Sequence, residues 1–123
     1  MKNSRILVIE DDLSIRDAVA LMLRSRGFEV IETESGEKGI DLARTANPAL
    51  ILSDIRMPDI DGFAVLDDLQ MDPNTVNIPF IFMTGCADCS KVASQLKRAV
   101  RVLEKPFSIE TLMNSVSAHL GEP

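Results

Sequence analysis

Five short apolar runs, separated by segments with helical periodicity, constrain this chain more than any other feature of its sequence. The runs lie at residues 6–9, 28–31, 50–52, 80–83 and 100–103. They are too short and too continuously apolar for amphipathic helices, and they are typical of strands buried on both faces. Helical spacing of apolar residues is clearest in the first and last intervening segments, at Ile15, Ala18, Val19 and Met22 and at Ile109, Leu112, Met113, Val116 and Leu120. The alternation predicts an α/β fold, a five-stranded doubly wound parallel sheet with helices on both faces.

The length and charge of the chain limit its domain count and its partners. A length of 123 residues and a hydrophobic content of 46%, enough to fill one core, predict one domain that spans residues 1–123. The sequence shows no linker within it. A net charge of −6 and a pI near 4.7 argue against direct nucleic-acid contact, which needs clustered Lys and Arg. No apolar run approaches the roughly 20 residues of a membrane span, and no signal-peptide core follows Met1. We therefore expect a cytoplasmic domain without a membrane partner.

Several residues mark where the helices begin and end. Gly27 follows the first helix, Asp61 precedes Gly62 as an N-cap, and Ser108 is placed to cap the last helix. Asp12 suits the positively polarised start of the first helix, whereas Glu10 and Asp11 call for another explanation.

Polar side chains follow four of the five predicted strands. Glu10 and Asp11 come after the first strand, Asp54 after the third, Thr84 after the fourth and Lys105 after the fifth. Ligands of open α/β sheets bind at the carboxyl ends of the strands, so we expect these groups to meet there. Clustered carboxylates repel one another unless a hard divalent cation lies among them, and oxygen ligands favour Mg²⁺ or Mn²⁺. An ammonium and a hydroxyl beside that cation suit an anionic group such as phosphate.

Four segments of the chain together resemble a known family. Residues 6–12, 53–62, 83–85 and 104–107 read ILVIEDD, SDIRMPDIDG, MTG and EKPF. In this order and spacing they are similar to the signature segments of receiver domains of two-component response regulators, chemotaxis regulators among them. The resemblance covers essentially the whole chain. It implies a flavodoxin-like sheet with strand order 2-1-3-4-5.

The resemblance also implies a function and a role for each site residue. Asp54 would accept a phosphoryl group from a phosphohistidine of a histidine kinase or phosphotransfer protein, and the domain would then switch conformation. Mg²⁺ would be bound by Asp11 and Asp54 directly, by Glu10 through water, and by the backbone carbonyl of Arg56. Thr84 and Lys105 would bind phosphoryl oxygens, and the peptide bond before Pro106 would be cis.

Such a domain assists its own phosphorylation and dephosphorylation but is not expected to turn over a free substrate as an enzyme. It acts on an output domain or protein that the sequence does not identify, and the resemblance admits a dimer that forms on phosphorylation.

Two alternatives compete with this interpretation. An aspartyl-phosphate phosphatase also combines a nucleophilic Asp, Mg²⁺ and a lysine, but it usually carries a second Asp two residues after the nucleophile. Arg56 occupies that position here and cannot transfer protons near neutral pH. A redox module is the other alternative, because Cys86 and Cys89 form a Cys-x-x-Cys pair after a strand. That hypothesis leaves Asp11, Asp54 and Lys105 unexplained, and we expect two free thiols.

Three departures from the family pattern concern modulation of the site. Val102 stands where an aromatic residue usually couples the fifth strand to Thr84, so we expect a different route of switching. Residues 99–101 lack the small Gly-Ala turn that commonly precedes the fifth strand, which predicts a shortened or reshaped fourth helix and loop. Neither Arg56 nor Cys86 can orient a hydrolytic water well, which predicts slow loss of the phosphoryl group.

Overall fold

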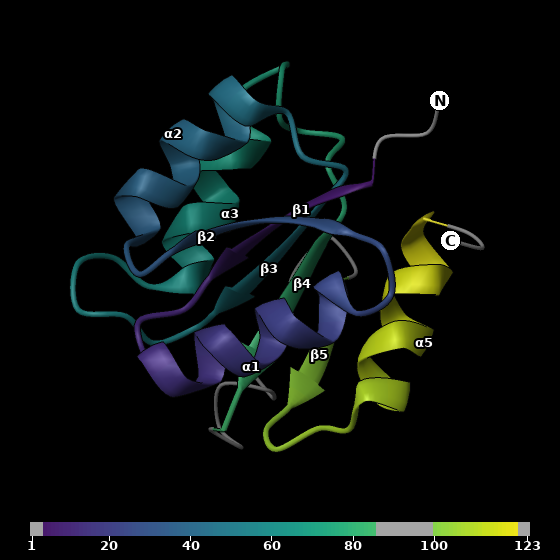
Figure 1. The fold of residues 1–123 in the computed structure, drawn as a ribbon. Coiled ribbons are helices and arrows are strands. Elements are labelled where there is room, and N and C mark those ends of the chain that lie inside the picture. Colours follow the sequence, from purple (N-terminus) through teal and green to yellow (C-terminus); the bar gives the residue numbers. More distant parts are fainter. Residues whose placement is uncertain (1–3, 86–99, 121–123) are drawn as a thin grey trace.

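The computed structural model describes residues 4–85 and 100–120 and has the predicted α/β architecture (Figure 1). Five strands and four helices lie in these residues: β1 (Arg5–Ile9), α1 (Leu13–Arg24), β2 (Glu29–Thr33), α2 (Gly36–Ala46), β3 (Leu50–Asp54), α3 (Gly62–Gln70), β4 (Phe80–Thr84), β5 (Arg101–Glu104) and α5 (Ile109–Leu120). Cys86, Cys89 and the predicted fourth helix lie outside the described residues.

All neighbouring strands pair in parallel, in the order β2-β1-β3-β4-β5. The sheet order implied by the resemblance is therefore confirmed. The register aligns the carboxyl ends of the strands, because Ile9 pairs with Ser53 and Asp54 pairs with Met83. The residues that follow β1, β3, β4 and β5 consequently reach the same edge.

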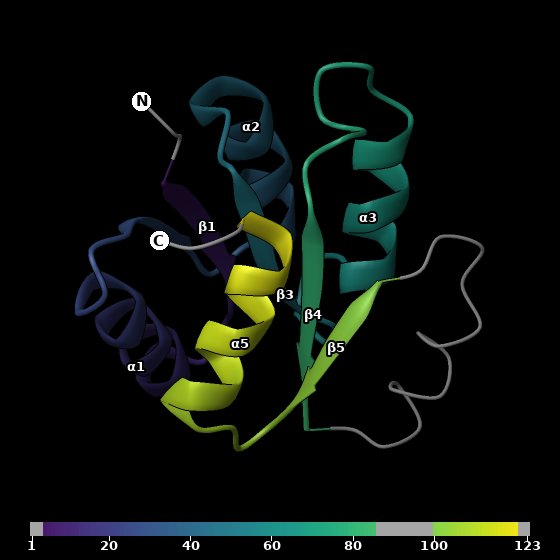
Figure 2. The same cartoon turned by 90° about the vertical axis from the view of Figure 1, so that its right-hand side faces the viewer.

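The helices cover both faces of the sheet. Helices α1 and α5 lie on one face, and α2 and α3 lie on the other (Figures 1 and 2). Alternate residues of β1 supply both hydrophobic cores, since Ile6 and Val8 pack toward α1 and α5 whereas Leu7 and Ile9 pack toward α2 and α3. This two-sided burial explains why the strands are continuously apolar.

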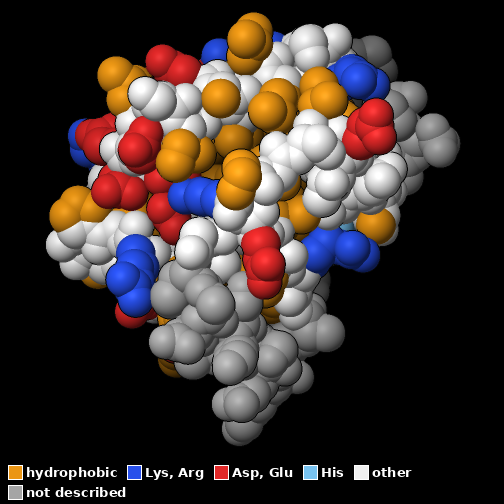
Figure 3. All heavy atoms as spheres, turned by 90° about the horizontal axis from the view of Figure 1, so that it is seen from below, with side chains coloured by type: hydrophobic (Ala, Val, Ile, Leu, Met, Phe, Trp, Pro, Cys, Tyr) orange, Lys and Arg blue, Asp and Glu red, His pale blue; other side chains and the backbone are white. Residues whose placement is uncertain are grey.

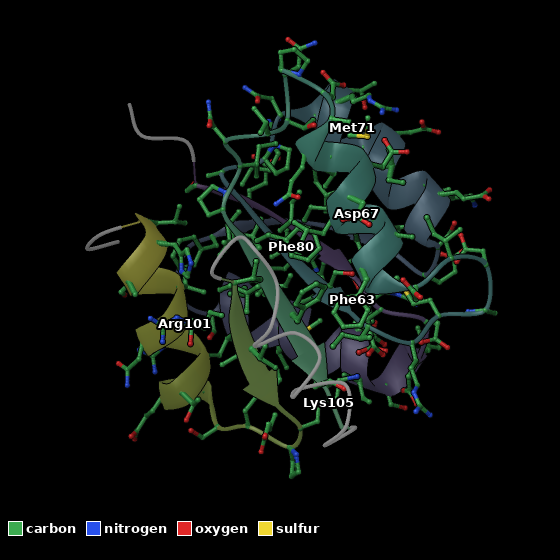
Figure 4. All side chains as sticks on the ribbon, turned by 180° about the vertical axis from the view of Figure 1, so that it is seen from behind. Phe63, Asp67, Met71, Phe80, Arg101 and Lys105 are labelled. Carbon is green, nitrogen blue, oxygen red and sulfur yellow. The ribbon has the colours of Figure 1, made fainter. Side chains whose placement is uncertain are left out.

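The second core contains a small aromatic cluster. The ring of Phe82 meets the rings of Phe63 and Phe80 edge to face, with centroids 5.1 and 5.0 Å apart. Figure 4 labels Phe63 at the start of α3 and Phe80 at the start of β4. These edge-to-face contacts help to hold the start of α3 against the sheet.

The predicted caps are confirmed. Asp12 accepts a hydrogen bond from the Ile15 backbone N–H, and Asp61 accepts one from Ala64. Ser108 Oγ accepts one from the Thr111 N–H at the start of α5. Gly27 has a φ of +90°, a conformation that glycine adopts without steric cost.

Most strand bounds differ by one or two residues from the predicted runs, and β5 covers Arg101–Glu104 rather than residues 100–103. Two differences have a clear structural reason. Strand β2 begins at Glu29 rather than Phe28, because the Phe28 N–H bonds to the Leu23 carbonyl at the end of α1 while its ring is buried. The buried face of α1 consists of Val19, Ala20 and Leu23, and Ala18 is exposed. Helix α1 is apolar around much of its circumference, so spacing alone did not distinguish the two faces.

Within the described residues, no helix combines the length and apolarity of a membrane span.

Candidate phosphoryl and metal site

Asp54 is the last residue of β3 and lies at the carboxyl edge of the sheet, with 8% of its surface exposed. Its Oδ1 accepts a hydrogen bond of 2.7 Å from the Ile55 backbone N–H. Its Oδ2 lies 3.0 Å from the Lys105 ammonium nitrogen. Both carboxylate oxygens are thus oriented, and the partly open position leaves Asp54 reachable from solvent.

The buried Glu10 and the half-buried Lys105 form the inner part of the site. Glu10 has no exposed surface, and its Oε1 accepts a hydrogen bond of 2.6 Å from Lys105 Nζ. Its Oε2 accepts a bond from the Asp12 N–H at 3.2 Å. Lys105 follows β5 (Figure 4), and its single ammonium therefore bridges the carboxylates at the ends of β1 and β3.

This arrangement shifts the pKa values of both Glu10 and Lys105. Burial, followed by the hydrogen bond and charge of Asp54, raises the pKa of Glu10 to about 7, against the opposing effect of Lys105. Burial alone would lower the pKa of Lys105, but Glu10 and Asp54 outweigh it and raise that pKa above its ordinary value. Lys105 therefore carries its charge at neutral pH, and Glu10 is near its titration midpoint.

Three carboxylates in this site could hold a metal ion. One oxygen each from Glu10, Asp11 and Asp54 lie within 4.8 Å of one another. The exposed Asp11 faces the same group from the start of the β1–α1 connection. With all three ionised, one ammonium leaves an excess of two negative charges, which a hard divalent cation with oxygen ligands would neutralise. The donor set fits Mg²⁺ or Mn²⁺.

Viewed from below, this face gathers Asp and Glu side chains beside a Lys or Arg side chain (Figure 3). The sequence-based prediction that Glu10, Asp11, Asp54 and Lys105 meet at one edge is confirmed. The predicted cis peptide bond between Lys105 and Pro106 is present.

The other predicted residues occupy the surroundings of this cluster. Thr84 ends β4, beside β3, and is buried, and its carbonyl accepts a hydrogen bond from the Lys105 N–H. Arg56 is exposed two residues beyond Asp54. Val102 is partly buried in β5 and packs on the core beneath α2 and α3. The roles assigned to these three residues stay predictions.

Two residues near the site were not singled out from the sequence. Arg16 of α1 donates a hydrogen bond of 2.9 Å to the Glu10 carbonyl and lies 3.8 Å from Glu32. Asp59, in the loop after β3, bonds to the start of α2. No sequence pattern indicates either contact. Asp59 and its partners are more than 20 residues apart, and Arg16 occupies an ordinary helical position.

An apolar hollow adjoins the site on the α1 side. It has a volume of about 450 Å³ and lies between α1 and the loop after β5. Its lining includes Ile15, Met22, Pro106 and Phe107, together with Lys105. Leu13, at the start of the same helix, is 60% exposed. Apolar surface thus lies directly beside the charged cluster.

Comparison with known families matches residues 6–117 to the response regulator receiver domain. Among curated proteins, the DNA-binding dual master transcriptional regulator RpaA of Synechocystis sp. is 36% identical over 117 residues. The aligned region covers 94% of this chain and 48% of RpaA. The chain spans about half the length of the curated relatives it matches.

Solved structures give the same family and fold. The chemotaxis protein CheY4 of Vibrio cholerae is 26% identical with a TM-score of 0.86, over 97% of this chain and 100% of CheY4. The receiver domain of sensor histidine kinase PA1611 of Pseudomonas aeruginosa was solved with a magnesium ion coordinated in its active site cleft. It has a TM-score of 0.86 at 23% identity, over 98% of this chain and 100% of that chain, and at this identity the similarity establishes the fold alone.

Proposed function

The chain belongs to the family of response regulator receiver domains, and from this premise we propose that Asp54 is its phosphoacceptor. The phosphoryl donor is a phosphohistidine of a histidine kinase or phosphotransfer protein. One observation carries the proposal: Asp54 ends β3 within an acidic cluster, partly open to solvent, with Lys105 held 3.0 Å from its carboxylate.

The chemistry requires positioning and charge neutralisation rather than a strong base. A carboxylate oxygen of Asp54 forms the new O–P bond as the P–N bond to the donor histidine breaks, and the electron pair of that bond returns to the imidazole nitrogen. Lys105 neutralises charge on the phosphoryl oxygens, and the Thr84 hydroxyl donates to one of them. A Mg²⁺ bound by Asp11, Asp54, the Arg56 carbonyl and, through water, Glu10 would supply further neutralisation.

The apolar hollow beside Lys105 supports a macromolecular donor. Its lining residues in α1 and at Pro106 and Phe107 offer apolar contact area next to the acceptor. We therefore assign this surface to the kinase or phosphotransfer protein, whose histidine must approach Asp54 directly.

The experiment compares the wild type with Asp54→Asn and Asp67→Asn during incubation with acetyl phosphate and Mg²⁺. Asp67 is an exposed aspartate of α3 outside the cluster (Figure 4), so its variant is a matched control. Intact mass spectrometry should show one added phosphoryl group on the wild type and on Asp67→Asn. It should show none on Asp54→Asn or after metal chelation. A phosphorylated Asp54→Asn protein would refute the assignment.

The same preparation distinguishes the receiver from the phosphatase alternative. A receiver retains its phosphoryl group on one aspartate and does not turn over an added phosphomonoester. Sustained hydrolysis of p-nitrophenyl phosphate that depends on Asp54 would favour the phosphatase.

A further inference from the structure

The side chain of Asp59 anchors the loop between β3 and α3 to the start of α2. Asp59 Oδ2 accepts hydrogen bonds from Ser35 Oγ at 2.8 Å and from the Glu37 N–H at 3.0 Å. Asp59 Oδ1 lies 3.2 Å from the Gly36 nitrogen, which donates to it. These donors come from a helix that begins more than 20 residues earlier in the chain, so the contact joins two separate parts of the molecule.

Close packing reinforces this anchor. A Cβ atom built on Gly36 would lie 2.7 Å from a side-chain carbon of Ile60 and 3.2 Å from its carbonyl oxygen. At the far end of the loop, the Gly62 N–H bonds to the Ile55 carbonyl at 2.7 Å. The loop from Ile55 to Asp61 is therefore closed on itself at its base and fixed to α2 at its middle.

The anchor is charge-assisted. Partial loss of solvent around the exposed Asp59 opposes its charge, but the hydrogen bonds from Glu37, Ser35, Ile60 and Gly36 hold the pKa of Asp59 well below its ordinary value. The carboxylate also lies at the positively polarised end of α2. Asp59 therefore carries its negative charge at neutral pH.

We propose that Asp59 is a positioning residue that holds the Arg56 backbone ready for the cation by tying the β3–α3 loop to α2. Arg56 lies between Asp54, which ends the strand, and Asp59, which is fixed to the helix. Without the anchor, cation binding would have to order the loop, and this loss of conformational freedom would weaken binding. The inference rests on the proposed function, because it concerns the same cation site.

The proposal predicts an effect on cation binding that an ordinary helix cap would not have. Asp59→Ala should raise the Kd for Mg²⁺ about tenfold, within the range typical of residues that orient metal ligands. Phosphorylation by acetyl phosphate should need correspondingly more Mg²⁺ for its half-maximal rate. The maximal rate at saturating Mg²⁺ should stay close to that of the wild type, because Asp59 does not touch the phosphoryl group.

The test measures Mg²⁺ binding to the full chain by calorimetry and by backbone amide NMR, beside urea unfolding of each variant. Glu37→Gln is the control for charge, because it removes one exposed carboxylate from the same helix end and leaves the Glu37 N–H in place. It should bind Mg²⁺ as the wild type does. Asp59→Asn retains one acceptor oxygen and should have a Kd between those of the wild type and Asp59→Ala.

If Asp59→Ala lowers stability but binds Mg²⁺ with the wild-type Kd, Asp59 is only a cap of α2 and the proposal is wrong. If Glu37→Gln lost the same Mg²⁺ affinity, the loss would come from the removed negative charge rather than from the anchor, and the proposal would again be wrong. Should Asp59→Ala not fold, Asp59→Asn supplies the comparison. Failure of the wild type itself to bind Mg²⁺ would instead refute the proposed function.

Discussion

Glu10 combines complete burial with two charged neighbours. Lys105 stabilises its ionised form, whereas burial and Asp54 stabilise its protonated form, and the second pair of effects is larger. A raised folded-state pKa means that the folded protein retains a proton that the unfolded chain has released. The stability that Glu10 contributes is therefore complete below about pH 4.5, the ordinary glutamate value, and is lost as pH rises through about 7.

We predict that the metal-free wild type becomes less stable relative to Glu10→Gln between pH 4.5 and pH 7. Gln mimics the protonated carboxyl and cannot titrate, so the difference isolates Glu10, and its change over this window should be about 2 kcal/mol. Urea unfolding with a chelator present, followed by far-UV circular dichroism because the chain has no Trp or Tyr, makes the measurement. Parallel pH profiles of the two proteins would contradict the prediction.

At the scale of elements, the turn from β3 into α3 depends on Gly62. A Cβ atom there would overlap the Asp54 carbonyl oxygen and lie 3.0 Å from the Ile55 Cα. Both obstacles are backbone atoms at the end of β3, which cannot move aside as a flexible side chain can. The close approach of helix and strand thus needs a residue without a side chain.

Gly62→Ala should lower the free energy of unfolding by about 3 kcal/mol, in the range of overpacked sites. Gly85→Ala is the control, because a Cβ atom built there meets no described atom within 4 Å apart from those of Gly85 and its chain neighbours. It should change stability by about 0.5 kcal/mol or less, as exposed substitutions usually do. Equal urea midpoints for the two variants would show that the turn can open to accept a methyl group.

The elements also show what sequence patterns could predict and what they could not. Continuous apolar runs predicted all five strands, and strand-end positions predicted that Glu10, Asp54 and Lys105 meet. The second inference applies to any parallel sheet, because its register brings the carboxyl ends of neighbouring strands to the same edge. The complete burial of Glu10 and the anchor at Asp59 depend on contacts between distant segments, which no local spacing encodes.

At the scale of the whole molecule, we expect the conformational change caused by phosphorylation to be transmitted from the site mainly through β4. Thr84 is buried at the end of that strand, and Val102 offers no ring whose rotation could carry a signal along β5. A hydroxyl drawn toward a phosphoryl group would move the residues that follow it. A switch in this sense requires a two-state element that the new charge biases.

Beryllofluoride, a phosphoryl mimic, should therefore shift backbone amide NMR signals most in the residues from Gly85 onward that follow β4. Signals of α5 should shift by less than half as much, in line with a local population change. Asp54→Asn treated in the same way is the control and should give no shifts. Equal shifts throughout β5 and α5 would indicate another route.

The ion pair between Lys105 and Glu10 joins residues 95 positions apart in the chain. Contacts of such long sequence separation close large loops and form late when a chain folds. During synthesis the acceptor site can assemble only after β5 has left the ribosome and paired with β4. A nascent copy, with Asp54 already made but Lys105 absent, lacks the ammonium that lies beside the Asp54 carboxylate in the folded protein. On the function proposed above, such a copy should accept a phosphoryl group less readily than a finished one.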